Sequence, residues 1–313
     1  MIKVEMMKKL FLMAGLVLLT AACSTDENDG VKVEKPIENP VEATAPVTVQ
    51  VNDFSVTMTD FTNAPAMTRS AVDAANFADV KCVTLAIYAG DEEVYKATQI
   101  KSDGTTYTTF GVFSFNIPIG TYTLVAIGRN YWTGDEFVLN SPSSAGYTSE
   151  RPRETFCHTR SVTVTSTTPL SLNVTLSRII AQLYIQSTDG RSAGVTKIRT
   201  TYAAGSKSFN PTTGLALDDN GFSQTNTPSQ AVTSPINIYS NVFLTTDEQT
   251  MDITIEALDA SNNVLFTKVV TDVPLQRNRK TTLSGAIFTA GSSSTGIKLE
   301  TDWIDGDGNT VTF

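Results

Sequence analysis

The feature that most constrains the fold is a hydrophobic period of two residues, repeated in short segments along most of the chain. Alternating apolar and polar side chains are typical of a β-strand with one buried face. The first clear case runs from Val47 to Thr59, and its alternation skips a step at Asn52 and Asp53, which predicts a β-bulge. The side chains expected to point inward are those of Val47, Val49, Val51, Phe54, Val56 and Met58.

Similar segments follow, separated by turn signals such as Ser102-Asp103-Gly104. The chain also contains 47 threonines, a residue type that favours strands. Only residues 70–78 suggest a helix, of two turns. The further strands are expected at residues 80–88, 94–99, 106–116, 121–129, 161–165, 170–175, 178–186, 195–202, 236–245, 251–258, 264–271 and 280–288.

Short strands at this spacing predict an all-β fold of β-sandwich type, transthyretin-like or Greek-key. A chain of 313 residues, 41% of them hydrophobic, is long enough for two such sandwiches in tandem. We expect an N-terminal sandwich domain at residues 46–175 and a C-terminal one at residues 176–313.

Residues 1–22 have the composition of a secretory signal peptide. Lys8 and Lys9 precede an apolar run at residues 10–19, which is too short for a permanent membrane helix. Thr20, Ala21 and Ala22 then lead to Cys23. This order resembles a lipobox, in which cleavage before the cysteine leaves a thiol that carries a diacylglycerol. The alternative is an ordinary cleaved signal with an incidental cysteine.

Residues 23–45 predict a flexible, lipid-linked tether, because they are rich in charge and proline and lack apolar periodicity. Their acidic cluster at residues 26–29 resembles the surface-export signal of some Gram-negative lipoproteins. The net charge of −9 argues against nucleic acid as a partner. The single histidine, His158, excludes a His-rich metal site and most imidazole-dependent catalysis.

Three other motifs favour structural roles. Cys82 and Cys157 have no informative spacing, so whether they pair stays open. Cys157 and His158 are adjacent on an extended chain and point to opposite sides, which does not suit a nucleophile and its base. Residues 305–309 begin like a calcium loop but lack the glutamate that an EF-hand needs, which favours a turn. We expect no enzyme activity, no metal and no cofactor.

Several segments resemble the fimbrillin subunits of type V pili. Residues 84–88 and 117–126 are similar to their first domain, residues 176–185 to the strand that opens their second domain, and residues 277–285 to a late strand. Trp303 also fits. In order, and together with the lipobox, these segments cover nearly the whole chain. The resemblance implies a structural subunit of a surface pilus that serves adhesion.

In that family, a trypsin-like protease cuts after an arginine behind the first strand, and a C-terminal strand of the next subunit fills the groove left behind. The resemblance assigns the cut to Arg69 and Ser70, or else Arg69 is an ordinary surface residue. It assigns the donor strand to the C-terminal segment, which otherwise forms a terminal hairpin of its own domain. The donor residues would be Ile297, Leu299, Trp303, Val311 and Phe313.

The resemblance also implies partners and a location. The partners would be other pilus subunits, the outer membrane through the lipid of the precursor, and a host protein or glycan. The chain would be exposed at the cell surface. A second hypothesis is a glycan-binding surface lipoprotein that does not polymerise, with Tyr131 and Trp132 as an aromatic platform. The same two aromatics would otherwise pack between the domains.

Overall fold

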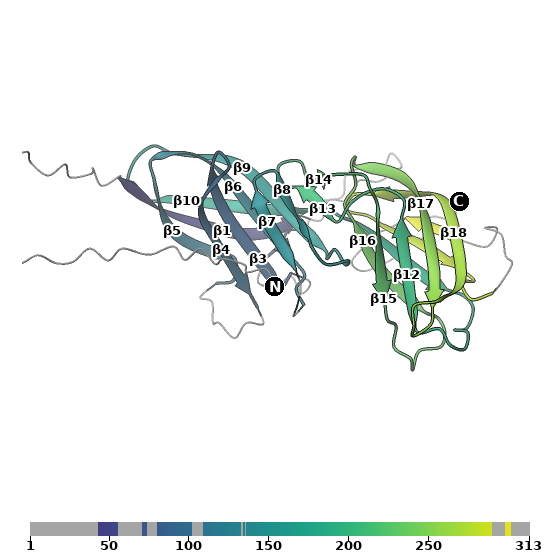
Figure 1. Ribbon diagram of the computed structural model, residues 1–313. Helices are drawn as coiled ribbons and strands as arrows, with labels where there is room; N and C mark the ends of the chain where they lie inside the picture. Colours follow the sequence, from purple (N-terminus) through teal and green to yellow (C-terminus); the bar gives the residue numbers. More distant parts are fainter. Residues whose placement is uncertain are drawn as a thin grey trace, which may run out of the picture. The chain divides into compact units, whose positions relative to one another are not determined.

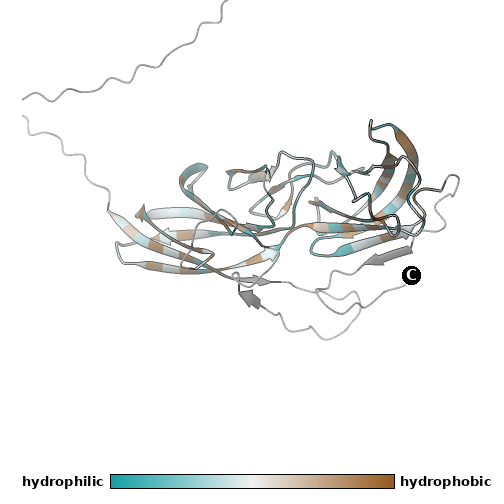
Figure 2. Ribbon diagram, turned by 90° about the horizontal axis from the view of Figure 1, so that it is seen from below, coloured by the Kyte–Doolittle hydropathy of each residue, from teal (hydrophilic) through white to brown (hydrophobic). Residues whose placement is uncertain are grey.

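The computed structural model describes residues 43–55, 71–73, 80–101, 109–132, 134, 136–289 and 298–301, and only the backbone of residues 52–55, 71–73 and 298–301. All of the described residues belong to one compact unit. The described part is all-β, as predicted, with twenty strands in four sheets (Figure 1). Apolar and polar residues alternate along these strands (Figure 2).

The first half of the described chain forms a sandwich whose two layers belong to one sheet. One layer has the order β5-β1-β10, and β2 pairs with the end of β1. The other layer has the order β9-β6-β3-β4. Strand β10 meets β9 at only two residue pairs, so the sheet folds over at this corner. The strands are β1 (Thr44–Ser55), β2 (Ala71–Asp73), β3 (Cys82–Ala89), β4 (Glu92–Ile100), β5 (Val112–Pro118), β6 (Gly120–Arg129), β9 (Thr155–Val164) and β10 (Leu170–Arg178).

Strand β1 agrees with the predicted pattern in its bulge but not in its start. The register against β10 shifts between Val51 and Asp53, which confirms the bulge. The strand begins at Thr44 rather than Val47, because residues 44–46 still pair with β5. The predicted helix at residues 70–78 is wrong for residues 71–73. These residues form β2, because pairing with residues 53–55 of β1 outweighs a weak local preference.

The second half forms a sandwich of two separate sheets. Their orders are β16-β11-β19-β20 and β15-β12-β17-β18. Strands β12, β17 and β18 lie side by side in Figure 1. The strands are β11 (Ala181–Ser187), β12 (Lys197–Tyr202), β15 (Phe222–Asn226), β16 (Asn237–Val242), β17 (Glu248–Leu258), β18 (Val264–Gln276), β19 (Lys280–Gly285) and β20 (Lys298–Thr301).

The two halves repeat one pairing scheme. In each half the first strand pairs parallel with a late strand and antiparallel with a middle one: β1 with β10 and β5, and β11 with β19 and β16. The opposite layers match as well, as β4-β3-β6-β9 and β15-β12-β17-β18. Strand β20 is an addition to this scheme, and it covers the outer edge of β19.

A fourth sheet combines strands from both halves, in the order β14-β13-β8-β7. We call it the joint sheet; its strands are β7 (Phe137–Ser141), β8 (Ser144–Tyr147), β13 (Ser208–Asn210) and β14 (Leu215–Ala216). Ser208 and Phe209 of β13 pair with β8, so the joint sheet crosses the predicted domain boundary. That boundary at residues 175–176 lies within β10, and the division into two domains stays a prediction.

Candidate functional site

Strand β1 occupies a seat inside the first sandwich. Its inward side chains, Ala45, Val47, Val49 and Val51, are at most 2% exposed, whereas Gln50 points to solvent. They share one core with Phe113 and Ile117 of β5, Val174 and Leu176 of β10, and Leu85 and Leu124 of the opposite layer. The sequence folds this way because the period of two puts every second residue on the core side.

The backbone of β1 is paired along both edges. Residues 44–50 pair with β5, and residues 47–55 pair with β10. Beyond the strand pairing, the amide of Val51 donates to the carbonyl of Gly111 at 3.0 Å. Withdrawal of β1 would therefore leave two strand edges with unpaired backbone groups and an apolar floor between them. We call this position the β1 seat.

Most predicted maturation residues lie outside the described residues. These are Cys23, Val56, Met58, Arg69 and Ser70. Phe54 lies in β1 with only its backbone described. The segment that carries Arg69 joins the end of β1 at Ser55 to the start of β2 at Ala71.

The predicted donor segment is described only at β20. Leu299 lies opposite Leu283 of β19 in an antiparallel pair, at the edge of its sheet. Ile297, Trp303, Val311 and Phe313 lie outside the described residues.

One side chain that the sequence did not single out fixes the path of the chain beyond β19. The Asp189 carboxylate accepts hydrogen bonds from the amides of Ile287 and Phe288, at 2.8 and 2.7 Å. It also accepts one from the Thr289 hydroxyl at 3.0 Å. Asp189-Gly190 reads as an ordinary turn in the sequence, so the pattern contains no sign of this contact, almost 100 residues away.

Trp132 is 58% exposed, which does not fit packing between domains. Lys81 Nζ and Arg153 Cζ each lie 5.8 Å from the centre of its ring, within range of a cation–π interaction. Its neighbour Tyr131 lies beside the guanidinium of Arg129, 5.5 Å from ring centre to Cζ. Cations therefore flank the predicted aromatic platform.

Cys157 and His158 point to different environments, as predicted. Cys157 is buried in the core of the joint sheet, and its Sγ donates to the carbonyl of Pro211 at 3.4 Å. Burial raises the pKa of its thiol from 9.0 to about 12. Burial, and then the nearby Arg160, lower the pKa of His158. A protonated, enclosed thiol is a poor nucleophile.

The fold separates the two buried cysteines. Cys82 lies in β3 and Cys157 in β9, and β6 runs between these strands. Two strand spacings amount to about 9.6 Å, and a disulfide requires Cα atoms within about 7 Å. The structure therefore does not bring them close enough to pair.

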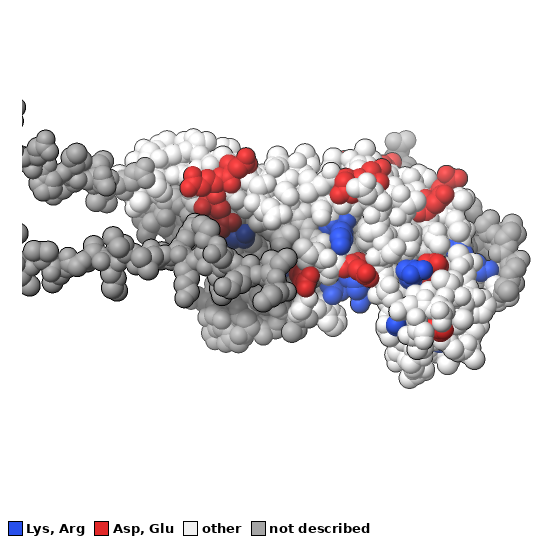
Figure 3. All heavy atoms as spheres, viewed as in Figure 1, with Lys and Arg blue, Asp and Glu red and all other residues white. Residues whose placement is uncertain are grey.

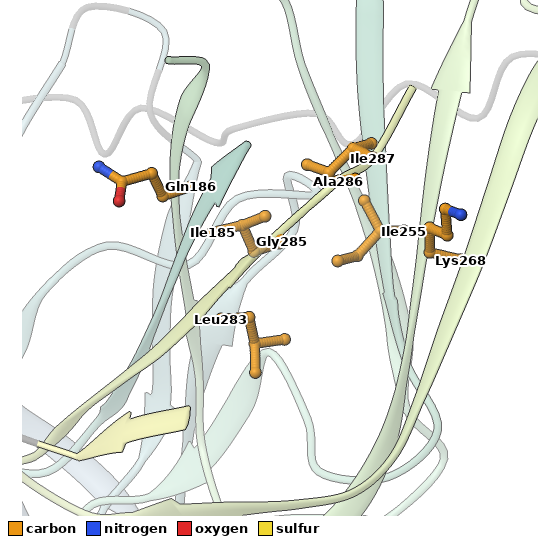
Figure 4. A pocket seen from close by; sticks show the side chains of 8 residues that line it. All are labelled: Ile185, Gln186, Ile255, Lys268, Leu283, Gly285, Ala286 and Ile287. Carbon is orange, nitrogen blue, oxygen red and sulfur yellow. The ribbon is translucent and has the colours of Figure 1, made fainter. Parts of the chain in front are cut away.

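The C-terminal sandwich has a small apolar pocket, with a volume of about 10 Å³, which is room for about one water molecule. Ile185 and Leu283 come from one sheet, and Ile255 and Lys268 from the other (Figure 4). Lys268 Nζ donates a hydrogen bond to the carbonyl of Thr289 at 2.8 Å. This lining offers a gap between two sheets rather than a set of convergent polar groups.

On the face seen in Figure 3, acidic and basic side chains form small separate groups. Within the described ranges, no group of three or more His, Cys, Asp or Glu residues could hold a metal ion. A helix long and apolar enough to cross a membrane is absent from the part of the chain that the structure describes.

Comparison with known proteins gives one family and a set of similar folds. Residues 44–313 match the model of DUF6562, a family of unknown function, and this match begins at the first residue of β1. No curated protein matches the chain. A Bacteroides ovatus protein provisionally described as an adhesin has the same fold, with a TM-score of 0.50, 10% identity, and coverage of 82% of this chain and 93% of that one.

Two other solved structures are similar at lower scores. A Bacteroides thetaiotaomicron protein, provisionally described as polysaccharide-binding, has a TM-score of 0.49 and 12% identity, over 82% of this chain and 95% of that one. The fimbrial anchor protein Mfa2 from Porphyromonas gingivalis has a TM-score of 0.45 and 9% identity, over 83% of this chain and 98% of that one. The structural neighbours are thus Bacteroidales adhesin-like and fimbrial proteins, as the resemblance to fimbrillins implied.

Proposed function

This chain belongs to the DUF6562 family, and we propose that it is a structural subunit of a cell-surface fimbria that polymerises by strand exchange. The observation that carries the proposal is the β1 seat. A strand near the N-terminus lies between two strands that come much later in the chain. Such a strand closes the sandwich of a precursor, and a strand of another subunit has the right geometry to replace it.

The proposed exchange begins with a cut between Arg69 and Ser70. This cut leaves β2 on the mature chain and separates it from residues 1–69, which contain β1 and Cys23. Loss of β1 would expose the apolar floor of the seat, with Phe113 of β5 and Val174 of β10 among its residues. Exposed apolar surface between two open strand edges binds another strand strongly.

The C-terminal segment is the proposed donor. Among the described strands, β20 pairs along one edge only, with β19, whereas β1 is paired along both edges. Fewer backbone hydrogen bonds must therefore break to release β20 than to release β1. Placed in the seat of a neighbouring subunit, Leu299 and its apolar neighbours would take over the buried positions of β1.

A solved structure with the same fold supports a role in adhesion. The Bacteroides ovatus protein that shares this fold is provisionally described as an adhesin. On this proposal the precursor is exported as a lipoprotein through Cys23 and held at the outer membrane. Its partners are then other fimbrial subunits, and it acts as a structural protein rather than an enzyme.

The first test of this function is Arg69→Ala in the cell that produces the protein. We expect wild-type surface protein to begin at Ser70 and to form fibres. The variant should begin at lipid-modified Cys23 and form none, because β1 stays in its seat. N-terminal sequencing, intact mass and electron microscopy measure both results.

Arg151→Ala is the matched control, because it removes an arginine that is exposed to solvent and lies away from the proposed cut. It should leave cleavage and fibres unchanged. Fibres of normal length from Arg69→Ala, or wild-type fibres that retain residues 44–55, would refute the proposed maturation.

A further inference from the structure

The outer face of sheet β16-β11-β19 carries an unusual set of side chains. On β11 the outward residues are Gln182, Tyr184 and Gln186, and they alternate with buried Leu183 and Ile185. The register of β16 sets one partner beside each of them: Asn241, Tyr239 and Asn237. Two tyrosines thus form the middle row, with a glutamine–asparagine pair on either side. We call these six residues the amide–tyrosine face.

The tyrosine pair presents aromatic surface to solvent. The rings of Tyr184 and Tyr239 are stacked, with centres 4.7 Å apart and planes at 25°. Tyr239 is 53% exposed, and it lies on β16, the edge strand of the sheet. A large aromatic side chain held this far out of the core is available to a ligand.

The hydrogen bonds between the paired amide groups are long. Gln182 Nε2 donates to Asn241 Oδ1 at 3.3 Å, and Gln186 Nε2 donates to Asn237 Oδ1 at 3.4 Å. Both distances exceed the usual range for such bonds. Gln186 Nε2 also donates to the Tyr184 hydroxyl at 3.3 Å, and Asn241 Nδ2 donates to the carbonyl of Pro152 at 3.0 Å. Each amide has two N–H donors and an acceptor oxygen with two lone pairs, so each row still has groups that can bond to the hydroxyls of a ligand.

The six residues of the face are uncharged, and Lys280 of β19 borders them. The outward residues of β11 and β16 include no acidic or basic side chain, in a protein with a net charge of −9. On the third strand, Lys280 Nζ lies 5.9 Å from the ring centre of Tyr184. Lys280 of β19 lies opposite Gln182, so one cation borders the face. The six uncharged side chains, with their donors and acceptors, complement a neutral ligand that is rich in hydroxyls.

We propose that the amide–tyrosine face binds a neutral polysaccharide, with the apolar face of a sugar ring on Tyr239 and its hydroxyls on the flanking amides. Successive rows are two residues apart along the strand, so the outer rows are about 13 Å apart. This length suits a stretch of glycan chain rather than a single sugar. The site is separate from the β1 seat, and the inference does not depend on polymerisation.

The test is native gel electrophoresis of the complete chain through gels that contain a β-glucan, a mannan, a xylan or polygalacturonate. We expect slower migration in at least one neutral polysaccharide and none in acidic polygalacturonate. Tyr239→Ala should weaken the binding about tenfold, since it removes one exposed stacking ring. Tyr239→Phe should retain it, because the ring remains.

Trp132→Ala is the matched control, because it removes an exposed aromatic residue that lies outside the amide–tyrosine face. It should leave the retardation unchanged. The proposal fails if no neutral polysaccharide slows the wild type, if only polygalacturonate does, or if Trp132→Ala abolishes the binding while Tyr239→Ala does not. Circular dichroism of Tyr239→Ala checks that its fold is intact.

Discussion

At the scale of single residues, burial decides what Cys157 can do. The sequence presents a cysteine beside the only histidine, a pair that chemistry could use. The fold encloses the thiol in the core of the joint sheet, and this burial raises its pKa to about 12. The thiol is therefore almost entirely protonated at neutral pH, and the residue acts as a small apolar side chain.

We predict that Cys157 in the folded protein does not react with a thiol reagent at pH 8. In a Cys23→Ser variant, denaturant should make both remaining cysteines reactive. Mass spectrometry of the labelled peptides measures this. Rapid labelling of Cys157 without denaturant would contradict the burial of its thiol.

The same pKa shift also makes stability depend on pH. The unfolded thiol ionises near pH 9 and the folded one near pH 12, so this contribution is complete below pH 9 and declines as the pH rises toward 12.

At the scale of elements, β1 shows which features of a strand a local sequence pattern can predict. Period-two alternation predicted that Val47, Val49 and Val51 face the core, and the skipped step predicted the bulge. The pattern did not predict that β1 would lie parallel to β10, which begins more than 100 residues later in the chain. It also failed for residues 71–73, whose strand exists only because β1 offers an edge.

We predict that Val49→Ala in β1 destabilises the protein by about 2 kcal/mol, because it deletes two buried methyl groups and leaves a small cavity. The neighbouring change Gln50→Ala is the control. Its side chain is exposed, so the free energy of unfolding should change by less than about 0.5 kcal/mol. Urea unfolding of both variants gives the two values. Equal losses would mean that β1 is not packed in its seat as described.

At the scale of the whole molecule, the joint sheet connects the two halves. The hydroxyl of Thr159 donates to the carbonyl of Pro211 at 2.8 Å, and the amide of Tyr147 donates to the carbonyl of Lys207 at 3.0 Å. Strands β8 and β13 approach each other closely at Gly146. A Cβ atom there would lie 2.8 Å from the Cα of Ser208.

We predict that Gly146→Ala forces β8 and β13 apart and uncouples the halves. The wild type should unfold in one calorimetric transition, and the variant in two. Gly190→Ala is the control, since a Cβ atom there meets nothing within 4 Å. A single unchanged transition in Gly146→Ala would show that the joint sheet does not carry the coupling.

The sequence pattern did not predict the joint sheet. Its four strands have two to five residues each, too few for a readable alternation. They exist because they pair with one another across the predicted boundary. The amide–tyrosine face is similar, because Tyr184 and Tyr239 meet through a register that only the folded sheet sets.

The sequence by itself determined the all-β class, most of the long strands, and the inward direction of Val47, Val49 and Val51 in β1. These follow from alternation and strand preference, which act between near neighbours. Only the tertiary structure decided the parallel pairing of β1, the separation of the cysteines, the joint sheet and the exposed tyrosine pair. Each of these depends on contacts between residues far apart in the chain, and a local pattern contains no information on where a distant partner lies.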